Sequence, residues 1–394
     1  MRILFIHTQY TQLGGEDQSL QSEIKLLNQH GHSTDCLLFK NEKNNSFFEN
    51  LKNGFYAFYN PQSFAIASKK IKDFKPDIVH IHNLFFKASP SVLYAAKKNN
   101  IPVVATIHNY RLLCSNALLL RNNKPCELCV HSVFPIYGVQ HKCYHSSALA
   151  SAMVTGITGV HKTMNSFTKT INTFITLTDF AKEKLLSSSL KLPSNKIVVQ
   201  PNFTPDYGIG QVKRNNYFLF AGRLTEEKGI QFLLKAFSEL PNEQLVVAGE
   251  GPLQNQLVAE YNACNNIVFE GKLKNSEIIN RMKHCKALLF PSLWYEGLPL
   301  SIIEAFSTGT PVLASNLGAM ATMIINSYNG LHFKPGSSTE IKTVVHNFNN
   351  LSNQEQLYAN ARQTFLNYYT DTVHYAALMK IYNHVLCSNQ KKLK

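Results

Sequence analysis

Two glutamates separated by seven residues mark the segment whose residue types most clearly suggest chemistry. Glu296 and Glu304 flank Gly297, Leu298 and Pro299 at a predicted helix start. Proline suits the first helical position because it has no N–H to leave unpaired, and the free amides of a helix N-terminus attract anions. Glu304, about one and a half turns further in, can accept hydrogen bonds from a vicinal diol such as a ribose. The segment predicts a phosphate-sized pocket between two carboxylates. Two incidental surface carboxylates are the alternative, which is disfavoured because an unpaired charge among apolar neighbours of Glu304 would be costly.

The same segment resembles a known family. Residues 294–306 resemble the Glu-x7-Glu signature of the retaining glycosyltransferases of family 4, and the later stretches 309–312, Gly318 and 329–331 are similar as well. The resemblance implies an α/β protein of the GT-B fold, in which two Rossmann-like domains face each other across a cleft. It implies transfer of a sugar from a nucleotide-diphosphate-sugar to an acceptor, with retention at the anomeric carbon. We therefore expect Glu296 to be catalytic and the donor to be bound by Gly297, Leu298, Pro299 and Glu304.

A second cluster, residues 222–229, contains Arg223 and Lys228. In the resembled family the matching arginine and lysine hold the diphosphate of the nucleotide-sugar. Fixed cations suit this role because breaking the sugar–phosphate bond leaves a nucleoside diphosphate with growing negative charge. Surface ion pairing with Glu226 and Glu227 is the alternative. Since no Asp-x-Asp motif occurs in the chain and two cations can serve the diphosphate, we expect no catalytic metal.

The first half contributes Gly15 and His108 to the predicted site. Gly15 lies in the glycine turn 12–17, where a missing side chain lets backbone amides approach a phosphate or a sugar. An ordinary tight turn is the alternative. His108 follows a buried-looking strand and resembles the family's histidine beside the reacting sugar, although a structural histidine would look the same. No carboxylate that could act as a covalent nucleophile is evident near His108, so we expect departure and attack on one face of the sugar. His80 and His82 share a face of one strand, and we favour a structural or cleft-lining role over metal binding.

Four cysteines, Cys114, Cys126, Cys129 and Cys143, lie in a predicted insertion at 112–145. Four thiolates with one Cys-x-x-Cys pair can satisfy a tetrahedral zinc ion, which would fold an insertion that lacks an obvious core. Buried free thiols and a redox pair are the alternatives, and the spacing does not decide among them. The run is similar to a cysteine-containing subgroup of bacterial family 4 enzymes that build surface polysaccharides.

Short apolar runs alternate with helix-period segments, which is typical of parallel sheets covered by helices. The 394-residue chain is 44% hydrophobic, which excludes a disordered or fibrous protein and predicts two domains, or three. We predict an acceptor-side domain at 1–203, a nucleotide-sugar domain at 204–370, and a terminal helix with a frayed basic tail at 371–394 that packs back on the first domain. Strands are predicted at 2–8, 34–39, 78–82, 102–107, 173–178, 196–200, 217–222, 244–249, 266–270, 286–291 and 311–315. Helices are predicted at 16–30, 89–99, 147–169, 179–188, 228–240, 252–264, 276–284, 298–308 and 339–350.

The basic residues are unevenly distributed. The formal charge is +14, and residues 51–200 carry 18 basic but only 5 acidic side chains. Such an excess favours an anionic partner, which could be a phospholipid surface, a phosphorylated substrate or nucleic acid, with solvated surface charge as the alternative. Because the resembled enzymes usually act on a lipid-linked acceptor, we expect a membrane surface that presents a lipid-linked or other glycan acceptor. The expected contributors are lysines around a group of aromatic side chains, with a buried aromatic core as the alternative. They are Lys52, Lys69, Lys70, Lys72 and Lys75, near Phe55, Tyr56, Phe58, Tyr59 and Phe64. No run approaches the ~18 apolar residues of a membrane span, so we expect a cytoplasmic protein that attaches peripherally to the inner face of the membrane.

Two other classes of protein remain as rivals. A nucleotide-sugar epimerase shares the two-domain plan but does not resemble the Glu-x7-Glu segment. A zinc-containing nucleic-acid-binding protein would explain the charge, but it leaves Glu296 and Glu304 without a role, and the aromatic residues form no stacking platform. We therefore expect no nucleic-acid partner. The base and sugar of the donor, and the acceptor, cannot be read from the sequence.

Overall fold

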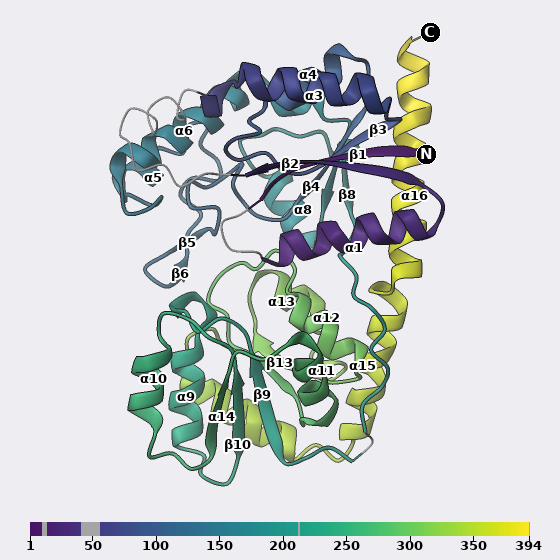
Figure 1. The fold of residues 1–394 in the computed structure, drawn as a ribbon. Coiled ribbons are helices and arrows are strands. Elements are labelled where there is room, and N and C mark those ends of the chain that lie inside the picture. The colour runs from purple at the N-terminus through teal and green to yellow at the C-terminus, as the bar shows by residue number, and fades with distance from the viewer. Residues whose placement is uncertain (10–13, 41–55, 212, 394) are drawn as a thin grey trace. The chain divides into compact units, whose positions relative to one another are not determined.

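The computed structural model describes residues 1–9, 14–40, 56–211 and 213–393, with the side chains of 391–393 left out. The chain forms two compact α/β units, drawn in Figure 1. Unit 1 comprises Met1–Leu119, Cys126–Asn202 and His374–Lys394, and unit 2 comprises Leu120–Pro125 and Phe203–Val373.

Unit 1 is built on a parallel sheet of six strands in the order β2-β1-β3-β4-β7-β8. Strands β3 and β7 are buried throughout, as expected where helices cover both faces of a sheet. The order reverses between β1 and β3, which makes the carboxyl ends of these strands a topological switch point. The strands are β1 (Arg2–Gln9), β2 (Ser33–Lys40), β3 (Ile78–Asn83), β4 (Val103–Ile107), β7 (Thr173–Thr176) and β8 (Ile197–Val199).

The helices of unit 1 include one from the far end of the chain. The apolar core of this unit joins β1, β3 and β4 to α1 and to the last helix, α16, whose Leu378 and Tyr382 are fully buried. The helices are α1 (Gly15–Gln29), α3 (Pro61–Phe74), α4 (Ser91–Lys98), α5 (Ile136–Gln140), α6 (Ala148–Thr163), α7 (Ser166–Thr170), α8 (Asp179–Leu186) and α16 (Asp371–Leu393).

Unit 2 has a second parallel six-stranded sheet, in the order β11-β10-β9-β12-β13-β14, with the switch point between β9 and β12. The strands are β9 (Tyr217–Ala221), β10 (Gln244–Ala248), β11 (Ile267–Gly271), β12 (Leu288–Phe290), β13 (Val312–Ser315) and β14 (Gly330–Phe333), beside a small hairpin of β5 (Leu120–Arg121) and β6 (Lys124–Pro125). The helices are α9 (Ile230–Ser238), α10 (Gln254–Tyr261), α11 (Asn275–His284), α12 (Leu300–Ser307), α13 (Gly318–Met323), α14 (Ser338–Asn349) and α15 (Gln354–Tyr368).

The structure corrects three predicted elements. The single helix predicted at 147–169 is two helices, because α6 ends at Thr163 and Asn165 adopts a left-handed backbone with φ 55°, a conformation that asparagine tolerates better than most residues. The C-terminal tail predicted to be frayed is helical to Leu393. Pro299 lies one residue before the first turn of α12, where its missing N–H still costs nothing.

Candidate functional site

The switch point of unit 2 brings a lysine and a glutamate into contact. Lys228 follows β9 and Glu296 follows β12, and the Lys228 Nζ donates a hydrogen bond to Glu296 Oε1 at 2.7 Å. Ser292 Oγ donates a second hydrogen bond to the same oxygen, at 2.8 Å. Glu296 is buried, whereas the side chain of Lys228 is 24% exposed. Lys228 therefore pairs with a residue 68 positions away, and the neighbouring Glu226 and Glu227 are not its partners in this contact.

A glycine makes the close approach at this switch point feasible. Gly229 has φ +68°, and a Cβ there would lie 2.0 Å from the carbonyl oxygen of Pro291. A larger residue would therefore clash with the backbone that leaves β12, in a conformation that side chains already disfavour. Gly229 thus lets the loop with Lys228 lie directly against the loop that leads to Glu296.

Glu304 is buried inside α12, with 6% of its surface exposed. Asn275 Nδ2 donates a hydrogen bond to Glu304 Oε1 at 2.8 Å. Burial raises the pKa of Glu304, and the hydrogen bond from Asn275 offsets part of this effect. Tyr207 is also near, since the charge of Glu304 adds to the burial that raises the pKa of Tyr207 to about 12. A buried carboxylate of this kind is suited to accept hydrogen bonds from ligand hydroxyl groups.

Unit 2 also contains the other residues that were predicted to bind the donor. Gly297 is partly exposed, and Leu298 and Pro299 are buried before the first turn of α12. Arg223 is exposed on the loop after β9. The structure thus brings Lys228 and Glu296 together and leaves Arg223 on the surface.

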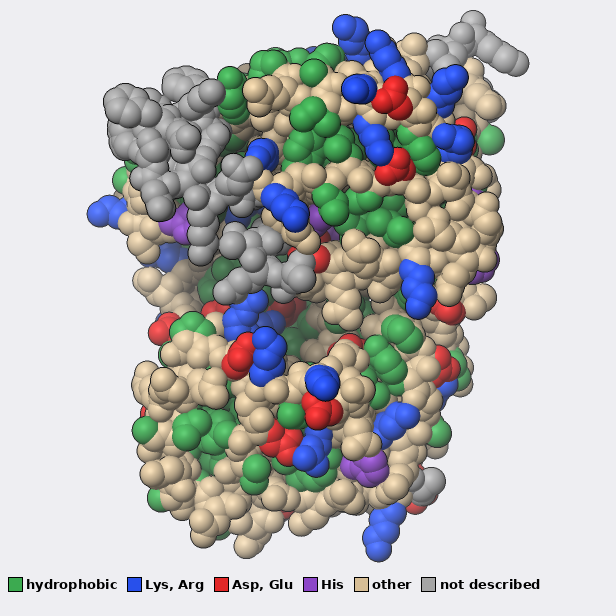
Figure 2. Space-filling view, viewed as in Figure 1, with side chains coloured by type: hydrophobic (Ala, Val, Ile, Leu, Met, Phe, Trp, Pro, Cys, Tyr) green, Lys and Arg blue, Asp and Glu red, His purple; other side chains and the backbone are tan. Residues whose placement is uncertain are grey.

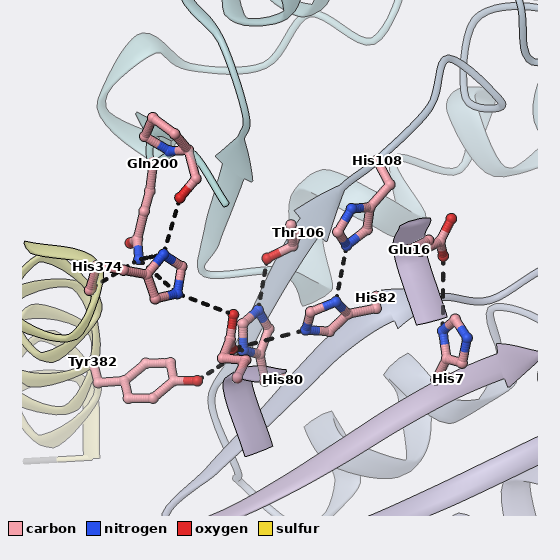
Figure 3. Close-up of polar contacts among 11 residues, drawn as sticks. His7, Glu16, His80, His82, Thr106, His108, Gln200, His374 and Tyr382 are labelled. Carbon is pink, nitrogen blue, oxygen red and sulfur yellow. Dashed lines mark hydrogen bonds and ion pairs between the residues drawn. The ribbon is translucent and has the colours of Figure 1, made fainter. Parts of the chain in front are cut away.

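In unit 1, His108 belongs to a buried network of histidines (Figure 3). It follows β4, and its Nε2 lies 2.9 Å from Nδ1 of His82 on β3. His80, on the same strand, lies 2.8 Å from Thr106 Oγ1 through Nε2 and 2.7 Å from Tyr382 of α16 through Nδ1. Burial lowers the pKa of His82 to about 4 and also lowers that of His108. Both rings are therefore neutral at pH 7.

The network that contains His108 also includes a buried carboxylate that was not predicted from the sequence. Glu23 of α1 is 5% exposed, and its Oε1 lies 3.0 Å from His80 Nδ1 and 3.8 Å from His82 Nε2. Burial alone would raise its pKa, but the charge of His80 and hydrogen bonds from His374, His80 and His82 hold the pKa well below its usual value. Glu23 lies behind His82, so it does not take the position of a nucleophile beside His108.

The glycine turn before α1 is only partly described, since Gln12 and Leu13 lie outside the described residues. Gly15 is the first residue of α1, and Gly14 N donates a hydrogen bond to Asp17 Oδ2 at 2.9 Å. Asp17 Oδ1 also lies 3.0 Å from Nε2 of His7, which is buried near the carboxyl end of β1. Gly15 therefore lies close in sequence to a polar group at the switch point of unit 1.

The four clustered cysteines lie near one another in unit 1, since the other three thiols all act on Cys129. Burial raises the pKa of Cys129 to about 11, and the neighbouring thiols Cys114, Cys143 and Cys126 contribute to the rise. Cys114 and Cys129 are buried. Among the described residues, however, Glu23, His80 and His82 are the group of at least three donor side chains whose ligand atoms all lie within 4.8 Å. The thiols are therefore neighbours without the close spacing of a formed tetrahedral site.

Metal analysis of the purified protein should decide the role of these thiols. If they bind a structural zinc ion, the protein purified without chelators will contain close to one equivalent of zinc. A Cys126→Ser, Cys129→Ser double variant will lose it, because two of four ligands are gone. A Cys36→Ser, Cys264→Ser variant, which leaves the cluster intact, should keep the metal. Less than about a tenth of an equivalent in the unaltered protein would reject the zinc site.

The predicted basic and aromatic cluster is only partly exposed. Lys52 and Phe55 lie outside the described residues. Lys69, Lys72 and Lys75 are exposed on or just after α3, whereas Lys70 pairs with Asp35 at 2.5 Å. Tyr59 is exposed, and Tyr56, Phe58 and Phe64 are half-buried. On the face drawn in Figure 2, basic side chains (blue) lie scattered among acidic and apolar ones.

Large apolar side chains are exposed elsewhere in unit 1. Five of them fall between residues 133 and 149, around α5 and the start of α6. They are Val133, Phe134, Ile136, Tyr137 and Leu149, of which Ile136 is 63% and Leu149 is 61% exposed. No helix in the described part of the chain is both long and apolar enough to cross a membrane.

Several residues of these sites have no motif that could have revealed them. Ser292 and Asn275 hold the two carboxylates of unit 2, but a single hydroxyl or amide carries no spacing signal. Glu23 did leave a signal, because it interrupts the buried face of α1 between Leu20 and Leu27. A charged residue on an apolar helix face is costly unless it is paired, so its presence there indicates a buried polar network.

Comparison with known proteins agrees with this architecture. The chain is similar to the Anabaena protein HepE, solved in complex with UDP, with a TM-score of 0.67 and 15% identity over 97% of this chain and 100% of that one. The two parallel sheets, each with charged or polar side chains at its switch point, therefore define the two-domain GT-B class. The family described as "Glycosyltransferase Family 4" matches residues 25–205, and that described as "Glycosyl transferases group 1" matches residues 208–364. The chain belongs to the glycosyltransferases that combine these two domains.

Individual relatives match over shorter stretches. An uncharacterised glycosyltransferase of Methanocaldococcus jannaschii is 33% identical over 34% of this chain and 37% of its own length. The Escherichia coli UDP-Gal:alpha-D-GlcNAc-diphosphoundecaprenol alpha-1,3-galactosyltransferase is 27% identical over 47% of this chain and 54% of its own length. The chain thus spans between about a third and a half of these curated relatives.

Proposed function

We propose that the protein transfers a sugar from a nucleotide-diphosphate-sugar to a glycan or lipid-linked acceptor, with retention of anomeric configuration. The observation that carries the proposal is the Lys228–Glu296 contact at the switch point of unit 2, beside the helix that contains Glu304. HepE was solved with UDP, and the relative from Escherichia coli uses UDP-Gal and a lipid-linked acceptor, which supports this class of donor and acceptor.

Each side chain receives a chemical role from its surroundings. Lys228 and Arg223 would stabilise the charge that develops on the diphosphate leaving group. Glu304 would accept hydrogen bonds from the ribose hydroxyls, and Glu296 would hold Lys228 in place and contact the donor sugar. His108 would act beside the reacting sugar, and Gly15 would let its loop approach the donor. The amides of Gly297 and Leu298, before Pro299 and α12, suit the donor phosphates.

A panel of nucleotide-sugars tests the proposal directly. A cognate donor should raise the melting temperature, because a ligand that binds only the folded protein stabilises it, and it should be hydrolysed slowly without acceptor. NMR of the product formed with an acceptor should show the anomeric configuration of the donor. Inversion would reject the retaining mechanism. Interconversion of the nucleotide-sugar without transfer would identify an epimerase, and binding to nucleic acid without either reaction would favour the third class.

The reaction should need no divalent metal. Because Lys228, Arg223 and a helix start can serve the diphosphate, we expect transfer to continue in EDTA at close to the untreated rate. Immediate loss of turnover that magnesium or manganese restores would contradict this expectation. Slow loss with a falling melting temperature would instead indicate removal of a structural zinc ion from the cysteine cluster.

Binding to anionic membranes is proposed for unit 1, where exposed lysines and exposed apolar side chains occur. Each lysine near such a surface contributes about 1 kcal/mol, so the anchor would be weak and reversible. We expect sedimentation with anionic but not neutral vesicles, reduced by salt. Changing Lys69, Lys72 and Lys75 to Glu should weaken it more than the same change at Lys235, Lys274 and Lys334, which are exposed in unit 2. No sedimentation at low salt would favour a soluble acceptor.

A further inference from the structure

Two buried side chains, Glu23 and His82, lie behind the half-buried His108, and the proposed mechanism does not use them. His82 connects Glu23 and His108 into a chain, because its Nδ1 lies 2.9 Å from His108 Nε2 and its Nε2 lies 3.8 Å from Glu23 Oε1. Glu23 and His82 are each at least nine-tenths buried. Glu23 Oε1 also lies 3.0 Å from His80 Nδ1, whereas His82 Nε2 has no hydrogen-bond partner among the described residues. Glu23 Oε1 is therefore the carboxylate oxygen that faces His82 Nε2, and His80 shares it.

The charges in this chain determine where its protons lie. The low pKa of Glu23 keeps its carboxylate ionised, and the low pKa of His82 keeps that ring neutral, with a single N–H. A carboxylate oxygen stabilises a proton on the nearer ring nitrogen and repels a lone pair there. His82 therefore carries its proton on Nε2, so its Nδ1 is an acceptor. Since His82 Nδ1 cannot donate, His108 must donate its own Nε2–H across the 2.9 Å contact.

We propose that Glu23 and His82 are positioning residues that fix the His108 ring with its proton on Nε2 and its Nδ1 free to accept a hydrogen bond from a substrate hydroxyl. This inference rests on the proposed role of His108 in sugar transfer. It adds that His108 serves as an acceptor at Nδ1, and that α1 and β3 determine which nitrogen it presents. A histidine's tautomer is commonly set by the partner of its other nitrogen in this way.

A metal ion held by Glu23, His80 and His82 is the competing interpretation of the same cluster, because their ligand atoms lie within 4.8 Å. His80 argues against it. Its Nε2 contacts Thr106 at 2.8 Å, and its Nδ1 lies 2.7 Å from the Tyr382 hydroxyl and 3.0 Å from Glu23 Oε1. A metal ion would have to displace both contacts of Nδ1, whereas the proposed chain from Glu23 through His82 to His108 leaves them in place. Figure 3 shows His82 between His80 and His108, with Tyr382 reaching the cluster from α16.

The tautomer of His108 can be measured without any substrate. In protein labelled with 15N-histidine, NMR should show His108 protonated on Nε2, with its signals assigned by their loss in His108→Gln. Glu23→Gln and His82→Phe should each change the tautomer or populate both forms. His82→Asn should restore the native form, because the asparagine oxygen can accept from His108 Nε2–H. His161→Phe is the matched control: His161 is a buried histidine of the same unit that bonds Ser166 and the Phe58 carbonyl.

Kinetics give the second measurement. With the cognate donor, Glu23→Gln and His82→Phe should lower kcat about 10- to 100-fold, the scale for a misplaced reacting group, and leave the donor KM within about twofold. His82→Asn should recover most of the loss, and His161→Phe should change stability but not kcat. An unchanged His108 tautomer in both variants, or a stoichiometric metal that Glu23→Gln releases, would overturn the proposal. If the tautomers behave as expected but no donor turns over, the proposed function fails and the positioning chain stands.

Discussion

Replacing Lys228 or Glu304 by alanine should lower the rate of sugar transfer at least about 100-fold, the scale for losing one charged contact in a desolvated transition state. Lys228→Ala removes the cation from the diphosphate and leaves the buried Glu296 with Ser292 as its remaining hydrogen-bond donor in this contact. Glu304→Ala removes a buried acceptor and leaves the amide of Asn275 without its partner. Steady-state kinetics with the cognate donor measure both effects.

Controls must separate chemistry from folding. Lys272 and Glu250 form an exposed ion pair in the same unit, with contact at 2.8 Å, so Lys272→Ala and Glu250→Ala test the loss of a charge away from the switch point. Both should retain nearly full activity, since exposed pairs contribute little. Lys228→Arg keeps the charge and should retain more activity than Lys228→Ala at equal melting temperature. Turnover near that of the unaltered protein in both Lys228→Ala and Glu304→Ala would refute the donor site.

The two sheets could be predicted from the sequence because their signals are local. The alternation of apolar runs and helices predicted both sheets, and the Glu-x7-Glu segment lies on one loop and one helix. The contact between Lys228 and Glu296 required the strand order, which places β9 beside β12 although 68 residues separate the two side chains. The role of Asn275 could not be predicted, because any polar residue near the start of α11 would have looked the same.

The histidine network shows the limit more clearly. His80, His82 and His108 were visible as strand-end histidines, but their partners come from the two ends of the chain. Glu23 is on α1, and Tyr382 is on α16, more than 300 positions from His80. Sequence periodicity shows that a helix has a buried face, but it does not show which sheet that face covers. The network therefore follows from tertiary packing.

Replacing Leu378 by alanine should lower the free energy of unfolding of unit 1 by about 2–5 kcal/mol, the usual cost of a cavity left by a fully buried leucine. Leu378 has no exposed surface, and it belongs to the core cluster that contains Phe5, Leu27 and Tyr382. Lys380→Ala, two residues along α16 at an exposed position, is the control and should change stability by less than about 0.5 kcal/mol.

The single tryptophan makes this experiment specific for one unit. Trp294 is in unit 2, so its fluorescence reports on that unit, whereas far-UV circular dichroism reports on both. Leu378→Ala should move the part of the circular dichroism transition that belongs to unit 1 to lower denaturant concentration. At denaturant concentrations below that transition, unit 2 should still bind the donor. If Leu378→Ala were no more destabilising than Lys380→Ala, α16 would not pack on the core of unit 1 in solution. Tyr382 could then not support the histidine network from that helix.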